Sequence, residues 1–128
     1  MTEEPSSATD RLRDLTALLA RRIAQAEEQR DSLSRAIEDM RTARSLTFAD
    51  DEHDPEGSTV SLDQARDAAL LVRTTSQLDE LREARRRLDE GCYGDCSSCG
   101  RPIPEERLRA RPEARLCVPC SDRASSAR

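Results

Sequence analysis

The sequence predicts an all-α fold in which a long antiparallel coiled-coil helical hairpin precedes a small cysteine-containing module. Only 35% of the 128 residues are hydrophobic and 2% are aromatic, which is too little for a thick globular core. Charged residues of both signs make up 37% of the chain, a composition typical of long exposed helices. Four of the five cysteines form two closely spaced pairs near the C-terminal end. We therefore expect helices with narrow apolar stripes and a separate small module.

The first predicted helix spans residues 9–46, after a frayed N-terminus at residues 1–8. Apolar side chains recur every seven positions, at Leu12, Leu19, Ala26, Leu33 and Met40. Neither Pro nor Gly interrupts residues 6–54. A helix this polar cannot bury its stripe alone, so it needs a partner helix.

The second predicted helix supplies that partner. Residues 54–57, Asp-Pro-Glu-Gly, break the pattern, and residues 61–64, Ser-Leu-Asp-Gln, restart it as a capping box. The apolar stripe drifts along this helix, from Leu62, Ala65, Ala69 and Val72 to Leu71, Leu78, Leu81 and Leu88. Gly91 is a natural C-terminal stop. Because the connection is short, the helices should pair antiparallel within one chain over residues 9–90, which predicts a monomer.

The loop between the two helices carries the net charge of the chain. Residues 47–60 hold five acids and no base, and the formal net charge of the whole chain is −5. Asp51, Asp54 and Glu56 are therefore candidate effector residues at the tip of the hairpin. The alternative is that they belong to an ordinary water-exposed turn, in which His53 is a solvated side chain rather than a pH sensor.

The two cysteine pairs have the spacing of a four-cysteine zinc ribbon. They are C-x₂-C pairs separated by 17 residues, and they consist of Cys96, Cys99, Cys117 and Cys120. Each two-residue gap lets one tight turn present two thiolates to the same ion. The matched spacing of the pairs, taken with a reducing cytosol, disfavours the alternatives, which are two disulfides or four free thiols. The odd total of five cysteines also fits badly with a full disulfide framework. The sequence thus predicts one structural zinc ion within residues 91–121, followed by a short tail at residues 122–128.

A cluster of arginines between the cysteine pairs forms a candidate partner-binding surface. They are Arg107, Arg109, Arg111 and Arg115. Glutamates are interleaved with them, so a mixed-charge surface is the alternative, and the scarcity of aromatic residues argues against nucleic-acid binding. Cys92, four residues before Cys96, is interpreted as a bystander, with a competing ligand or a redox sensor as alternatives.

Neither an enzyme nor a membrane protein is expected. Four cysteine ligands leave zinc no open position for a catalytic water, and no nucleophile, base and orienting group form a recognisable set. No apolar run approaches the roughly 18 residues of a membrane span. The N-terminal Met-Thr-Glu-Glu-Pro is acidic where a signal peptide is basic. We expect a cytoplasmic protein.

Three segments together resemble the zinc finger of the DksA/TraR family. They are Gly-Asp-Cys-Ser-Ser-Cys-Gly at 94–100, the run at 103–112, and Leu-Cys-Val-Pro-Cys at 116–120. The match covers about residues 93–121, and a long helical hairpin directly before the zinc finger is the family's architecture. The resemblance implies a non-enzymatic transcription regulator whose hairpin enters the secondary channel of bacterial RNA polymerase. It also implies that the tip approaches the active site, that the zinc module docks near the channel rim, that the alarmone ppGpp acts with some members, and that no sequence-specific DNA contacts are made.

The chain also departs from the pattern of that family. The family's tip resembles D-x-x-D-x-A, which Asp51 and Asp54 match, whereas Glu56 stands where alanine is expected. The chain begins without the longer N-terminal segment of DksA proper and ends eight residues after Cys120, which resembles a shortened DksA-like protein. The alternative function is a zinc-stapled coiled-coil adaptor that binds an unrelated protein or self-associates.

Overall fold

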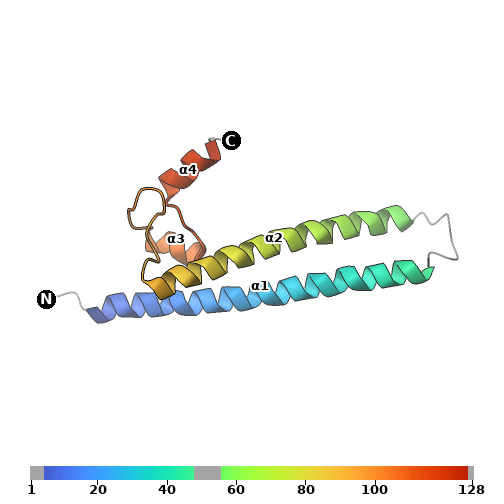
Figure 1. Ribbon diagram of the computed structural model, residues 1–128, viewed down its shortest axis with the longest axis horizontal. Helices are drawn as coiled ribbons and strands as arrows, with labels where there is room; N and C mark the ends of the chain where they lie inside the picture. Colours follow the sequence, from blue (N-terminus) through green and yellow to red (C-terminus); the bar gives the residue numbers. More distant parts are fainter. Residues whose placement is uncertain (1–4, 48–55, 127–128) are drawn as a thin grey trace. The chain divides into compact units, whose positions relative to one another are not determined.

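The computed structural model describes residues 5–47 and 56–126, and side chains over residues 9–46 and 61–126 (Figure 1). Its helices are α1 (Pro5–Thr47), α2 (Glu56–Glu90), α3 (Glu105–Ala110) and α4 (Val118–Ser126). The described residues contain no β-strand, which confirms the all-α prediction. None of these helices has the length and apolar character that crossing a membrane requires.

The chain divides into two compact units. We call Gln25–Leu78 the hairpin unit, and Met1–Ala24 together with Asp79–Arg128 the cysteine unit. Each unit contains part of α1 and part of α2, and Figure 1 shows these two helices side by side and antiparallel. The predicted helical hairpin is therefore confirmed.

Helix α1 buries its apolar stripe unevenly. Its buried residues are Leu15, Leu19, Ile23 and Ala26, all 6% exposed or less. Leu12 is 49% exposed, so its predicted place in the stripe is wrong. Leu15 and Ile23 lie four residues before and after Leu19, and side chains at that spacing share one face of a helix. Leu33 and Met40, farther along α1, are only half-buried.

The first half of α2 turns a different row inward from the one predicted. Its predicted apolar residues Leu62, Ala65, Ala69 and Val72 are all exposed, so this part of the stripe is wrong. The second part is confirmed, since Leu78 and Leu81 are at most 1% exposed. The same row continues from Leu78 toward the start of α2 in steps of three or four residues. It includes Asp67 and Gln64, which are half-buried. The inward row of α2 is therefore polar near its beginning.

The start of α2 also differs from the prediction. The helix begins at Glu56, so Ser61 lies inside it and the predicted capping box at residues 61–64 is wrong. A glycine and a serine, Gly57 and Ser58, fall in the first turn of this helix. The first backbone N–H groups of a helix have no intrahelical partner, so residues of low helix propensity are tolerated there.

The end of α2 follows the prediction. Gly91 has a φ angle of 83°, in the left-handed region that glycine enters without strain. The amide of Gly91 donates to the Leu88 carbonyl at 3.2 Å, and the amide of Cys92 donates to the Arg87 carbonyl at 2.9 Å. This pair of bonds is the Schellman motif, which satisfies the last carbonyls of the helix and turns the chain into the cysteine-rich segment.

The core of the cysteine unit brings α1 together with the segment that follows α2. Its buried members are Leu15, Cys96, Ile103, Leu108, Cys117 and Cys120, with Leu18, Tyr93 and Leu116 packed against them. At the surface of the same contact, Arg11 pairs with Glu105 at 3.6 Å and Arg109 pairs with Asp14 at 3.7 Å. Helix α3 is thereby held against α1. Neither α3 nor α4 is predicted by the sequence pattern.

Candidate metal centre

The four paired cysteines meet at one point of the cysteine unit. The sulfur atoms of Cys96, Cys99, Cys117 and Cys120 all lie within 4.8 Å of one another. Those of Cys99 and Cys117 are 3.7 Å apart. Four thiolates placed tetrahedrally at the usual Zn–S length of about 2.3 Å stand about 3.8 Å apart, so this arrangement fits one zinc ion. All five cysteines are free thiols, and Cys92 is exposed and stands outside the group.

Local backbone geometry places the first cysteine pair. The amide of Cys96 donates to the Arg101 carbonyl at 2.8 Å, and the amide of Gly100 donates to the Cys96 carbonyl at 2.9 Å. Gly100 has a φ angle of 78°, so a residue with a Cβ atom would be strained there. These bonds close a tight turn that holds both sulfurs of the pair on one side.

The second cysteine pair sits at the start of α4. Cys117 directly precedes the helix and Cys120 lies in its first turn. The amide of Ser121 donates to the Cys117 carbonyl at 2.8 Å. The amide of Ser97 donates to the Arg115 carbonyl at 2.8 Å, which links the two pairs through the backbone. The helix start and this cross-link bring residues far apart in the sequence to the same site.

The clustered thiols differ in how readily they ionise. Hydrogen bonds from the backbone of Cys117, and then of Cys99, lower the pKa of Cys96 to about 6. The Cys120 backbone acts to lower the pKa of Cys117, but burial and hydrogen bonds with the neighbouring thiols raise it to about 11. Adjacent thiols cannot all ionise without a compensating charge. A divalent metal ion supplies that charge, which is why coordinated cysteines are held as thiolates.

The candidate partner-binding arginines make contacts inside the cysteine unit. The Nε atom of Arg107 donates to the Leu116 carbonyl at 2.9 Å. Arg109 pairs with Glu105 on its own helix at 2.6 Å as well as with α1. Arg111 lies 3.8 Å from the buried carboxylate of Glu113. Arg115 is exposed, as are Arg109 and Arg111, whereas Arg107 is half-buried.

The predicted effector tip falls mostly outside the described residues. Asp51, His53 and Asp54 are among the residues that the structure does not describe, and Glu56 is described only as the first residue of α2. The structure therefore leaves the role of this tip as a prediction.

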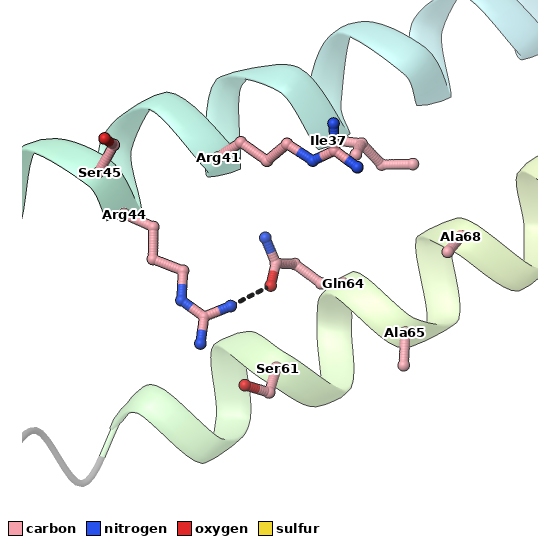
Figure 2. A pocket seen from close by; sticks show the side chains of 8 residues that line it. All are labelled: Ile37, Arg41, Arg44, Ser45, Ser61, Gln64, Ala65 and Ala68. Atoms are coloured by element: carbon pink, nitrogen blue, oxygen red, sulfur yellow. Dashed lines mark hydrogen bonds between the residues drawn. The ribbon is translucent and has the colours of Figure 1, made fainter. Parts of the chain in front are cut away.

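A groove in the hairpin unit is absent from the sequence prediction. It has a volume of about 850 Å³, and it is lined by Ile37, Arg41, Arg44 and Ser45 of α1 and Ser61, Gln64, Ala65 and Ala68 of α2 (Figure 2). The Nη1 atom of Arg44 donates to Oε1 of Gln64 at 2.7 Å, which joins the two walls. No acidic residue is among the eight that line the groove. In the sequence, the groove corresponds to arginines, which have long side chains, on the first helix and to alanines, which have short ones, on the second.

Fold and site together define a class of protein: a helical hairpin that carries a C-terminal four-cysteine zinc site. Residues 91–125 match the family model described as the prokaryotic DksA/TraR C4-type zinc finger. The resemblance to the DksA/TraR-type zinc-finger family is therefore confirmed, and the cofactor is one structural zinc ion. Four thiolates complete a tetrahedral shell, as in other structural zinc sites.

Curated relatives of known name are similar to part of this chain. General stress protein 16O of Bacillus subtilis is 34% identical over 68 residues, covering 53% of this chain and 42% of that protein. The RNA polymerase-binding transcription factor DksA of Caulobacter vibrioides is 38% identical over 61 residues, covering 44% and 43%. The chain thus spans less than half of the length of these curated relatives.

A solved structure shows the same fold over nearly the whole chain. Transcription factor DksA2 of Pseudomonas aeruginosa superposes with a TM-score of 0.74 at 24% sequence identity, covering 92% of this chain and 85% of that chain. At this level of identity, the likeness shows the fold alone.

Proposed function

We propose that this chain is a non-enzymatic transcription regulator that binds bacterial RNA polymerase through its secondary channel. The supporting observation is a DksA/TraR-type zinc finger joined to a helical hairpin of the DksA2 fold. One relative with 38% identity bears the name of an RNA polymerase-binding transcription factor. A zinc shell filled by four thiolates leaves no open coordination position, which fits a structural rather than a catalytic zinc.

In this proposal each part of the chain has its own task. The cysteine unit is a rigid base at the channel rim, the hairpin is the probe that enters the channel, and Asp51, Asp54 and Glu56 form the effector tip. The groove around Arg41 and Arg44 belongs to the probe and offers positive charge to acidic side chains of the polymerase. Arg115 offers a further cation at the base.

Direct binding to purified core RNA polymerase tests the proposal. We expect saturable binding of the full chain by biolayer interferometry, with a complex of one chain per polymerase. A second factor that occupies the secondary channel should displace it, because both need the same opening. Binding that such a competitor leaves unchanged would place the chain elsewhere on the polymerase. The same measurement with and without ppGpp tests whether this alarmone contributes.

One observation favours the adaptor as a second candidate. The hairpin unit exposes Leu46, Leu62 and Val72, with exposed fractions of 75%, 71% and 67%. Such side chains can pair with another chain. Light scattering separates the two candidates, since the regulator is expected to be a monomer. A dimer that persists on dilution, together with failure to bind core polymerase, would favour the adaptor.

A further inference from the structure

The zinc site has a side-chain neighbour on α4 that the cysteine spacing does not indicate. The Nη2 atom of Arg123 donates to the sulfur of Cys120 at 3.1 Å. Cys120 itself is 4% exposed, whereas Arg123 lies on the exposed surface of the helix. The guanidinium thus sits between a buried metal ligand and water.

The position of Cys120 in a helix explains why a side chain makes this contact. The sulfur of Cys96 lies in a turn and receives hydrogen bonds from the backbone at Cys117 and Cys99. Cys120 lies in the first turn of α4, and the next amide, that of Ser121, is already bonded to the Cys117 carbonyl. Amides farther along a helix bond to carbonyls four residues back and do not point at a side chain. A donor for the Cys120 sulfur therefore has to come from a side chain, and Arg123 lies one turn farther along the same face.

The charge of Arg123 is also available to this sulfur. No ion pair joins Arg123 to a carboxylate among the residues that the structure describes, although Asp122 is its neighbour in the sequence. An arginine cannot lose its proton in a protein, and a hydrogen bond from an ionised donor to a thiolate is stronger than one from a neutral donor. Such a bond orients the sulfur and withdraws electron density from it.

We infer that Arg123 is a positioning residue of the zinc site, which holds Cys120 in its ligand orientation and shields its sulfur from electrophiles. Partners that hydrogen-bond to metal ligands typically change metal affinity by about 10-fold to 100-fold when they are removed. Arg123 therefore contributes to zinc retention without contacting the ion.

The test compares two arginine variants of the full-length chain. Arg123→Gln removes the proposed contact, and Arg85→Gln removes an equal charge from an exposed arginine of the cysteine unit that makes no described contact with a cysteine. Titration of each zinc-loaded protein with a chromogenic chelator reports apparent zinc affinity. We expect Arg123→Gln to bind zinc about 10-fold more weakly than the wild type. Arg85→Gln should stay close to the wild type.

A second readout identifies the affected sulfur. Zinc-loaded proteins are treated with N-ethylmaleimide, and mass spectrometry follows the modification of each cysteine over time. Cys120 should react faster in Arg123→Gln than in Arg85→Gln, while the exposed Cys92 should react at the same rate in all proteins and serves as the internal reference. Circular dichroism checks that the variants have equal helix content. Equal zinc affinity and equal Cys120 reactivity in the two variants would overturn the inference.

Discussion

In the cysteine unit, side chains from α1 and from the segment after α2 pack into one core. The hairpin unit consists of parts of α1 and α2, and few of its described side chains are buried. The cysteine unit buries Leu15, Ile103, Leu108 and three of the zinc-binding cysteines. In the hairpin unit, Ala26, Thr74 and Leu78 are buried, whereas no residue described between Glu27 and Arg73 is. The comparison shows that one region packs a core, while the other exposes most of its side chains.

The physical cause of this difference lies in the inward rows of the helices. The buried residues of α1 and α2 are leucine, isoleucine and alanine apart from Thr74, and the apolar area that they remove from water stabilises the pair. Near its beginning α2 presents Gln64 and Asp67, whose polar groups need hydrogen bonds and cannot pack tightly. The bond between Arg44 and Gln64 is one such contact.

Loss of zinc should have the largest effect on the structure, and this effect should be confined to the cysteine unit. We expect Cys96→Ser with Cys99→Ser to abolish the bound zinc equivalent measured by metal analysis, because two of the four ligands are gone. Hydrogen exchange should show residues 91–126 losing protection while the hairpin unit keeps its own.

Cys92→Ser is the matched control, since Cys92 lies outside the sulfur cluster. Its zinc content should equal that of the wild type. A clear loss of zinc in Cys92→Ser would mean that the ligand set is wrong.

Substitutions at the predicted tip should separate polymerase binding from the effect on transcription. Asp51→Asn with Asp54→Asn keeps side-chain size and removes two charges. We expect polymerase affinity to change little, because the docking surface lies elsewhere in the proposed complex. The effect on initiation in a purified transcription assay should be largely lost. An unchanged transcription effect with intact binding would leave the chain as a passive occupant of the channel.

Matched leucine truncations measure the difference in packing. Leu19 is 1% exposed, and Leu19→Ala should lower the free energy of unfolding by about 3 kcal/mol, because it leaves a cavity in a packed region. Leu33 is half-buried in the hairpin unit, and Leu33→Ala should cost about 1 kcal/mol. Urea denaturation followed by circular dichroism gives both values. Equal costs would remove the contrast between the two units.

The groove arginines should give the smallest effect. Arg41→Gln with Arg44→Gln removes two exposed charges from the groove, and exposed charges contribute little individually, so polymerase affinity should fall about fivefold at low salt. Arg35→Gln with Arg73→Gln removes the same charge from exposed positions of the hairpin unit outside the groove. Similar losses of affinity in both double variants would assign the effect to overall charge. A difference in affinity between the variants that persists at high salt would argue against an electrostatic contact.

Short-range patterns in the sequence were sufficient for the metal ligands and for the general architecture. The two C-x₂-C pairs gave the four sulfurs that the structure brings together, because each pair is placed by its own tight turn or helix start. Gly91 was identified as a helix stop because its left-handed conformation is a local property. The need for two paired helices followed from polar helices that each have one apolar stripe.

Only the folded structure shows which residues face inward and which arginines contact the metal site. Leu62 and Val72 are more apolar than Gln64 and Asp67, yet the latter lie on the row that continues the buried leucines of α2, and one helix can present only one row to its partner. Arg107 and Arg123 look alike in the sequence, but one bonds to a backbone carbonyl nine residues away and the other to a zinc ligand. The inward row of α2 and the Arg107 contact depend on packing between segments that the local pattern does not connect. The Arg123 contact is set by helical spacing within α4, a helix that the sequence pattern does not predict.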